Sequence, residues 1–228
     1  MKIFLNSLKV LGLIFLSLIC NMAPIFLLSR QDSFSQPVQW LLGLLYIVFI
    51  ACVLYALWTF HKKHESDAIK QQTIRGADLG IALLFWLGMR IIAVVGTVAN
   101  QLYSGQETTA NDAALQSLTS FFADGFFLYT FLYVFLIGII APIIEELAYR
   151  AFPEHLLFKG RSRLLAGFVT TIVFALPHST NIIEFFTYAG IGALLYLAYQ
   201  RRGNIRDSIL VHILNNLPSA IFLFFMRF

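Results

Sequence analysis

The sequence is poor in charged residues and nearly free of cysteine. Only 12% of the 228 residues are Asp, Glu, Lys or Arg, and only two are cysteines. A soluble domain typically carries about 25% charged residues, whereas 59% of this chain is hydrophobic. This composition excludes an ordinary soluble domain and indicates a polytopic helical membrane protein. Cys20 and Cys52 both lie in apolar stretches, which disfavours a disulfide or a metal site formed by them.

Several familiar catalytic motifs are also absent. The chain has no H-E-x-x-H metalloprotease pattern, no G-x-S-x-G hydrolase motif and no G-x-x-x-x-G-K-[ST] phosphate loop. Its net charge of +4 comes mostly from basic loops, so we interpret the charge as a signal of membrane topology. We therefore expect the lipid bilayer as a partner and no nucleic acid.

Seven apolar segments follow one another along the chain, at 10–29, 39–60, 79–98, 121–141, 164–177, 182–199 and 208–226. A transmembrane helix needs about 20 residues, so the fifth segment is short, and its far end at Pro177 should lie inside the protein. We expect the fourth segment to continue as helix past Arg150 and to end near Phe152–Pro153, because the residue before a proline disfavours helix. The sequence predicts an all-α transmembrane bundle of about seven spans.

The loops between these segments predict the orientation. Three of them are rich in Lys and Arg, at 61–75, 159–163 and 201–206, whereas the loop 101–119 has none. Basic loops favour the cytoplasmic side, which places the N-terminus inside. The first apolar run is longer than a secretory signal core, so we expect a retained span. Arg90 lies within the third segment, where it should snorkel or pair with another polar group.

Three polar clusters stand out in the apolar second half of the chain. They are Glu145-Glu146 with Arg150, Phe174 with His178, and His212 with Asn216. An ionisable group at membrane depth is costly unless it is paired or lines a wet cavity, so it marks a functional site by default. We therefore treat these clusters as candidate active-site residues.

The acidic cluster divides into two roles. Glu146 and Arg150 are four positions apart and share one helical face, which predicts a structural ion pair. Glu145 is rotated by about 100° from Glu146, so it can face a cavity as a free carboxylate and act as a general base on water. The alternative is a neutralising network of all three residues at a helix end.

The two histidines complete a peptidase-like set. His212 and Asn216 share one face of the last span and could donate hydrogen bonds to an oxyanion, or could simply link helices. His178 could share the proton of an attacking water, or be a packing residue. Glu145, His178 and His212 also match a zinc site of two histidines and one carboxylate, so a metal is an open alternative. Asn215 points about 100° away from Asn216, and we expect it to pack elsewhere.

In order and spacing, these three clusters resemble the motifs of the CAAX protease and bacteriocin-processing (CPBP, or Abi) family of intramembrane proteases. The resemblance covers about residues 135–220 and implies an all-helical membrane endopeptidase. By position, Glu145 and His178 would activate water, while His212 and Asn216 would stabilise the oxyanion. The resemblance also implies a supporting role for Glu146 and Arg150, and a glutamate mechanism with no required metal.

These observations predict one membrane domain, 1–228, with N-terminal spans in 1–120, a polar loop at 61–78 and a peptidase-like core at 135–220. The expected substrate is a small peptide precursor or a lipidated, membrane-associated protein tail. Family analogy implies peptide maturation or bacteriocin self-immunity, in the plasma membrane, with the site facing the cytoplasm or inner leaflet. The rival hypothesis is a non-catalytic immunity or scaffold protein that binds a peptide. The sequence leaves the oligomeric state open.

Overall fold

The structure, a computed structural model, describes residues 2–122 and 125–225. Six helices in it are long and apolar enough to cross a membrane: α1 (Lys2–Ser29), α2 (Gln36–His64), α4 (Gly76–Ser104), a composite helix (Phe127–Phe158), α9 (Ile182–Arg202) and α10 (Ile205–Phe225). A shorter apolar helix, Arg163–His178, consists of α8 (Arg163–Ala175) and a 3₁₀ turn at Leu176–His178. No strand occurs in the described ranges. The all-α prediction is confirmed, with the fifth apolar segment as the short one.

The remaining helical pieces lie in the connections. They are a 3₁₀ turn at Gln31–Ser33, α3 (Asp67–Lys70), α5 (Ala110–Ser117) and a 3₁₀ turn at Leu118–Phe121. The predicted polar loop 61–78 is shorter than expected, because α2 continues to His64 and α4 begins at Gly76. Positions 123–124 and 226, which we included in predicted spans, lie outside the described residues.

The composite helix carries the first polar cluster and is unusually rich in π-helix. It contains α6 (Phe127–Phe135), a π-helical segment at Leu136–Ile140, α7 (Ala141–Glu146), and further π-helical segments at Leu147–Ala151 and Glu154–Phe158. Single π turns are rare in proteins and are frequent at functional sites.

The prediction that this helix ends near Phe152–Pro153 is wrong, since it continues to Phe158. Lys159, with a left-handed φ of 52°, then terminates it. A proline in an α-helix lacks one N–H donor and collides with the carbonyl group four residues earlier. The wider π turns on both sides of Pro153 displace these carbonyl groups, so the helix accommodates the proline.

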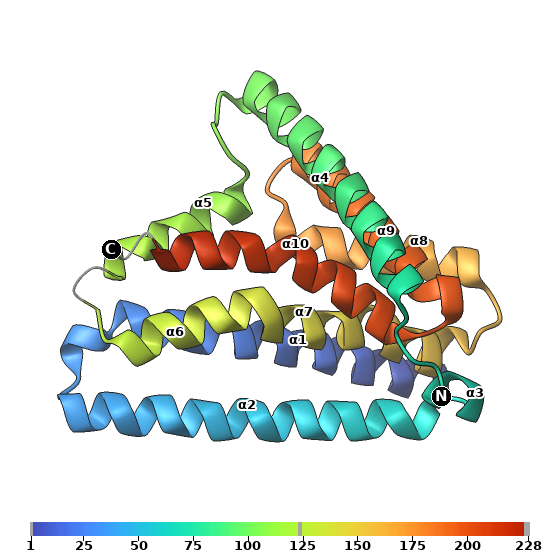
Figure 1. The fold of residues 1–228 in the computed structure, drawn as a ribbon, viewed down its shortest axis with the longest axis horizontal. Coiled ribbons are helices and arrows are strands. Elements are labelled where there is room, and N and C mark those ends of the chain that lie inside the picture. The colour runs from blue at the N-terminus through green and yellow to red at the C-terminus, as the bar shows by residue number, and fades with distance from the viewer. Residues whose placement is uncertain (1, 123–124, 226–228) are drawn as a thin grey trace.

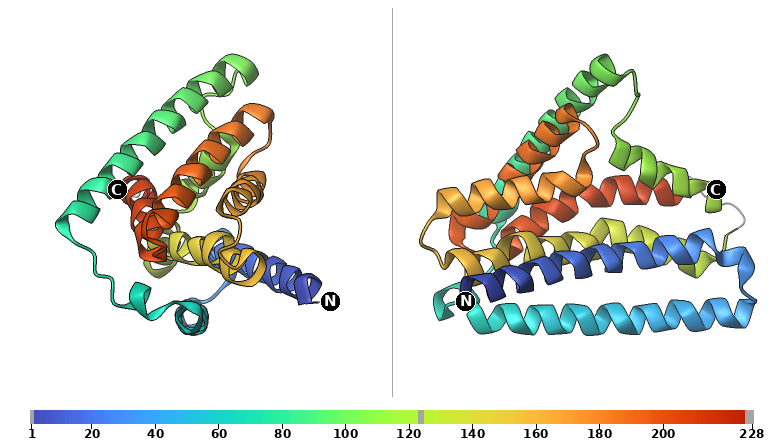
Figure 2. Two further views of the ribbon diagram at one scale, coloured as in Figure 1. Left: turned by 90° about the vertical axis from the view of Figure 1, so that its right-hand side faces the viewer. Right: turned by 180° about the vertical axis from the view of Figure 1, so that it is seen from behind.

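The helices form two packed groups. α1, α2 and the composite helix run side by side, while α4 lies against α9 and both tilt away from them (Figure 1). The two further views show the same arrangement, with α10 between the groups (Figure 2). Small residues allow the close approach of α4 and α9, because a Cβ atom added at Gly96 would collide with Thr187. The second group therefore depends on glycine at this contact.

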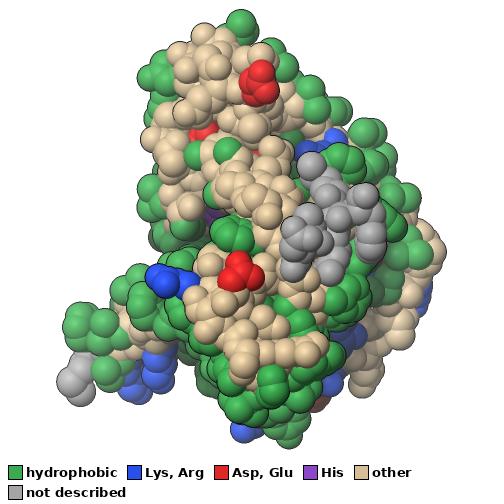
Figure 3. Space-filling view, turned by 90° about the vertical axis from the view of Figure 1, so that its left-hand side faces the viewer, with side chains coloured by type: hydrophobic (Ala, Val, Ile, Leu, Met, Phe, Trp, Pro, Cys, Tyr) green, Lys and Arg blue, Asp and Glu red, His purple; other side chains and the backbone are tan. Residues whose placement is uncertain are grey.

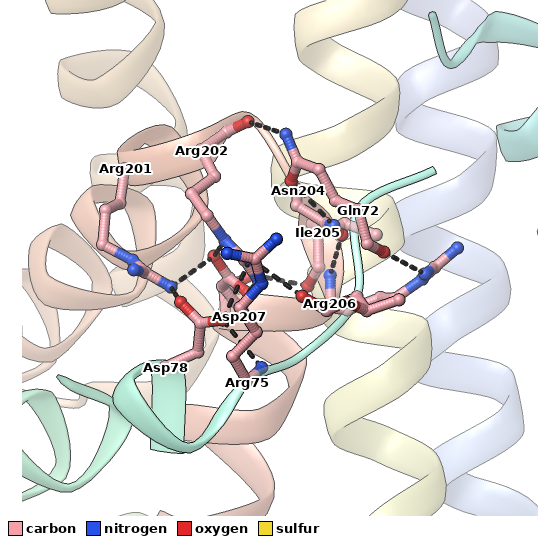
Figure 4. Close-up of polar contacts among 11 residues, drawn as sticks. Gln72, Arg75, Asp78, Arg201, Arg202, Asn204, Ile205, Arg206 and Asp207 are labelled. Atoms are coloured by element: carbon pink, nitrogen blue, oxygen red, sulfur yellow. Dashed lines mark hydrogen bonds and ion pairs between the residues drawn. The ribbon is translucent and has the colours of Figure 1, made fainter. Parts of the chain in front are cut away.

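Two of the basic loops, 61–75 and 201–206, meet at a charge cluster that joins α4, α9 and α10 (Figure 4). Arg201 and Arg202 each bridge Asp78 and Asp207, with N–O distances of 2.6–3.0 Å. Gly203, at a φ of 67°, makes the turn between the two arginines and α10. This cluster holds the first turn of α10 against α4, and so fixes the position of the helix that carries His212.

Candidate active site

Glu146 is the centre of the buried polar site. Its Oε1 atom lies 3.1 Å from Nη1 of Arg150 and 2.9 Å from Nδ1 of His212. Glu146 is fully buried, and Arg150 is 1% exposed. The Nη1 N–H is not directed at the carboxylate, so this contact is an ion pair without a well-aligned hydrogen bond. The structure thus forms the predicted Glu146–Arg150 pair and adds His212, whose contact with Glu146 the sequence analysis did not foresee.

Glu145 points in a different direction from Glu146. Its Oε1 atom accepts a hydrogen bond from Nδ2 of Asn21, at 3.1 Å, and its Oε2 atom lies 3.9 Å from Nε2 of His212. Asn21 belongs to α1, from which the sequence analysis selected no site residue. A polar amide within the first apolar segment was the signal that could have identified it.

The hydrogen bonds of the two histidines define which ring nitrogen is free. Nδ1 of His178 lies 2.7 Å from the carbonyl oxygen of Phe174, and a carbonyl oxygen only accepts. Nδ1 of His178 therefore carries the proton. Nδ1 of His212 likewise donates to the Glu146 carboxylate, which the adjacent Arg150 cation favours in its charged form. In both residues Nε2 is the nitrogen left for chemistry.

Phe174 connects the three clusters. The Arg150 guanidinium carbon lies 4.1 Å from the centroid of its ring, a cation–π contact. The ring is also 4.6 Å from the His178 ring and 6.1 Å from the His212 ring. A Cβ atom at Gly192 would approach Phe174 to 3.0 Å, so glycine lets α9 pack closely here. Phe174 therefore aligns Arg150 and both imidazoles.

Asn216 is held by the π-helical turn of the composite helix. Its Nδ2 donates to the carbonyl oxygen of Ile137 at 3.2 Å, and its Oδ1 accepts from Asn215 at 3.1 Å. In a π-helix the carbonyl oxygen of Ile137 would accept a hydrogen bond from the N–H of the residue five positions later. That residue is Pro142, which has no N–H. The free carbonyl thus orients Asn216 and leaves its second amide hydrogen available. Asn215, which we expected to pack elsewhere, directly supports it.

The turn after His178 is anchored by Glu184, a fully buried residue that the sequence analysis did not select. Its carboxylate accepts hydrogen bonds from the backbone N–H groups of Ala110 and Thr180, at 2.7 and 2.8 Å, and from the Thr180 hydroxyl at 2.9 Å. The ring of Tyr188, one helical turn later, lies 5.3 Å from that of His178. Glu184 therefore ties the loop before α5 to the turn that positions His178.

The residues proposed for a metal do not form a metal site in this arrangement. Across residues 2–122 and 125–225, no group of three His, Cys, Asp or Glu side chains could hold an ion. Nδ1 of His212 is engaged by Glu146, and Nδ1 of His178 by a backbone carbonyl. Nε2 of each ring stays free, as in histidines that bind a metal through Nε2, so the zinc alternative stays a prediction.

Comparison with known proteins places this site in a family. Residues 127–218, which hold all three clusters, match the family model described as type II CAAX prenyl endopeptidase Rce1-like. This match and the relatives described below support the CAAX protease and bacteriocin-processing family for this chain. At the family level they support an intramembrane protease that acts on a peptide or protein.

Three bacterial proteins are similar to the chain over most of its length. The UPF0177 protein YbdI of Lactococcus lactis subsp. lactis (strain IL1403) is 28% identical over 181 residues, which cover 78% of this chain and 93% of YbdI. The UPF0177 protein YbdJ of the same strain is 35% identical over 154 residues, 65% of this chain and 64% of YbdJ.

The third relative is named for a protease activity. The membrane-embedded CAAX protease MroQ of Staphylococcus aureus (strain USA300) is 30% identical over 154 residues, 64% of this chain and 57% of MroQ. The chain therefore spans less than two thirds of YbdJ and MroQ. No solved structure is significantly similar to it.

Proposed function

We propose that this protein is an intramembrane endopeptidase that cleaves a small peptide precursor or the tail of a membrane-associated, lipidated protein. One observation carries the proposal: Nε2 of His212 faces the Glu145 carboxylate at 3.9 Å, while Nδ1 is fixed by Glu146. Glu146 and Arg150 offset each other's charge in the buried cluster, which lowers the cost of placing charge at membrane depth.

The proposed chemistry uses Glu145 as the general base. A water molecule transfers one proton to Glu145, and its oxygen attacks the carbonyl carbon of the substrate. The second amide hydrogen of Asn216 stabilises the negative oxygen of the tetrahedral intermediate, and His212 adds an N–H at Nε2 when its ring carries a second proton as imidazolium. The C–N bond then breaks, and the proton passes to the leaving amine. His178, with a free Nε2, relays this proton. The mechanism requires no metal.

The biological role follows from the relatives only as a proposal. A membrane-embedded CAAX protease among them supports processing of peptides or lipidated proteins, and we propose peptide maturation or bacteriocin self-immunity in the plasma membrane. The alternative is a non-catalytic immunity or scaffold protein that binds a peptide in the same site. Such a binder would tolerate the near-isosteric change Glu145→Gln, whereas a hydrolase would lose its base.

The side from which the substrate approaches stays a prediction. The positive-inside rule places the basic loops in the cytoplasm, and the sequence predicts a site open to that side or to the inner leaflet. At the end opposite α3, however, the surface is hollowed and a histidine side chain is visible in the hollow (Figure 3).

A Thr180→Cys variant lacking Cys20 and Cys52 can be labelled with an impermeant maleimide from either side of sealed membranes. Labelling only from the cytoplasmic side would support the sequence prediction.

The main experiment is comparative peptidomics of host membranes and medium. Cells carrying the wild type, Glu145→Ala or the control Glu107→Ala, an exposed loop carboxylate, are compared at matched expression. A peptide that disappears only with Glu145→Ala, with its uncut precursor accumulating, is expected. Identical profiles, with the host phenotype still rescued by Glu145→Ala, would reject the enzyme in favour of the binder.

A further inference from the structure

Arg90 is a cation at the middle of α4 without a counter-charge. It lies 14 residues from either end of the helix Gly76–Ser104, which is about 21 Å along the axis in each direction. Among the described residues it has no ion pair, hydrogen bond or ring contact. Arg150, by contrast, is neutralised by Glu146. Of the two predictions for Arg90, pairing with another polar group is therefore wrong.

At the middle of α4, Arg90 would have to snorkel a long way to reach either membrane surface. The hydrocarbon core of a bilayer is about 30 Å thick, so its centre lies about 15 Å from each interface, well beyond the reach of an arginine side chain. Arg90 is only partly exposed, so protein covers one side of it. An unpaired cation in such a position is costly and is typical of residues that bind a charged ligand.

The helical repeat shows which way Arg90 faces. Gly88 and Ile92 contact α9, through Leu194 and Gly190. Each is two residues from Arg90 and therefore about 160° around the helix, so Arg90 faces away from α9. Trp86 and Ala93, one turn before and after, share its face.

That face borders the contact between α4 and α10. Ala93 packs against the cluster that contains Val211 of α10, and the two helices are in contact. Asn215 shares the face of Val211, one turn later. The buried Nε1 of Trp86 and the buried Oδ1 of Asn215 have no hydrogen-bond partner among the described residues. Asn215 in turn donates to Asn216, the proposed oxyanion donor.

We propose that Arg90 binds a carboxylate of the peptide substrate within the bilayer, at the margin of the α4–α10 contact. This inference rests on the proposed function and specifies its substrate: a peptide with a free C-terminus or an acidic side chain close to the cleaved bond. An arginine suits this role because its planar guanidinium forms two parallel hydrogen bonds with a carboxylate. The pair is strengthened by the low dielectric of the membrane.

A binding assay without turnover tests the inference. The Glu145→Gln protein is reconstituted in phosphatidylcholine vesicles, with Arg90 intact or changed to Lys or Met. Three fluorescein-labelled, palmitoylated apolar dodecapeptides serve as probes: one with a C-terminal carboxylate, one with a C-terminal amide, and one amide with an internal Glu. The first and third distinguish a terminal from a side-chain carboxylate, and the plain amide is the control without either.

Arg90→Met should weaken binding of a carboxylate peptide by about tenfold or more, the loss of a charge-assisted hydrogen bond. It should leave binding of the plain amide unchanged, and Arg90→Lys should retain part of the affinity. Three results would overturn the inference. The protein could bind all three peptides with equal affinity, it could bind none of them, or Arg90→Met could leave the affinity for the carboxylate peptides unchanged.

Thermal stability in detergent gives a second, independent readout. Arg90→Met removes an unpaired cation, so its melting temperature should equal or exceed that of the wild type, whereas the control Arg150→Met should melt lower. A lower melting temperature for Arg90→Met would show a structural role and overturn the inference. If the protein binds carboxylate peptides selectively but peptidomics finds no difference between wild type and Glu145→Ala, the proposed protease is rejected and the Arg90 site is kept. If peptidomics shows cleavage but binding does not depend on the carboxylate, the protease is kept and the Arg90 site is rejected.

Discussion

His212 and Glu146 are 66 positions apart in the sequence, yet Nδ1 of His212 lies 2.9 Å from Oε1 of Glu146. The same carboxylate oxygen is paired with Arg150. Glu146 therefore has two tasks: it neutralises a buried cation and it fixes the orientation of an imidazole. Stability and activity are consequently coupled through this one side chain.

Removing either partner of the buried pair should destabilise the protein. Glu146→Ala and Arg150→Ala each leave an uncompensated buried charge, which costs about 3–5 kcal/mol, so folded yield and activity should both fall. The double variant should recover part of this loss, as measured by a double-mutant cycle of detergent thermostability. Normal thermostability of both single variants would remove the ion-pair argument.

The two histidines should be required for proteolysis but not for insertion. We expect His178→Ala and His212→Ala each to abolish cleavage of the substrate found by peptidomics, because general acid–base groups typically contribute 10²–10⁴-fold. The exposed His64 provides the control, and His64→Ala should remain active. Membrane fractionation measures insertion. Retained proteolysis in either site variant would refute the role of that histidine.

The contact between α4 and α9 should not tolerate a methyl group at Gly96. A Cβ atom there collides with Thr187, whose hydroxyl donates to the carbonyl of Ile183 at 2.8 Å. Gly96→Ala should therefore cost about 1–3 kcal/mol by overpacking. The matched control is Gly12→Ala, since a Cβ atom at Gly12 meets nothing within 4 Å. It should be neutral or stabilise its helix by about 0.5–1 kcal/mol. Thermal denaturation in detergent compares the two, and equal stability would contradict the packing argument.

Loss of the Glu184 carboxylate should loosen the turn that holds His178. Glu184→Ala leaves three partly buried donors without their acceptor, and the cost reaches about 1–3 kcal/mol only for a donor that water cannot reach. We expect faster hydrogen exchange at Ala110 and Thr180 and a lower kcat. The control Asp112→Ala removes an exposed carboxylate of α5 and should change neither. Unaltered exchange in Glu184→Ala would show that the turn is held by other contacts.

Metal removal should leave activity intact. The mechanism proposed for Glu145 uses only side chains, so treatment with 1,10-phenanthroline followed by gel filtration should not change the rate of cleavage. Loss of activity that added Zn²⁺ restores would instead establish the metal mechanism, with Nε2 of His178 and Nε2 of His212 as the nitrogen atoms available to the ion.

Sequence by itself determined the features that depend on composition and short spacing. An apolar content of this size requires a membrane bundle, and the four-residue spacing of Glu146 and Arg150 requires a shared helical face. The divergence of Glu145 from Glu146 followed from the same periodicity: Glu145 contacts Asn21 and Glu146 pairs with Arg150, although both carboxylates also approach His212.

Only the tertiary structure decided which distant groups meet. The contacts of Asn21 with Glu145, of His212 with Glu146 and of Glu184 with Ala110 join helices whose order in space the local pattern does not specify. The passage of the composite helix through Pro153 also depended on π turns, which local preferences for α-helix and proline cannot predict. Periodicity states the direction in which a side chain points, but packing determines what it touches.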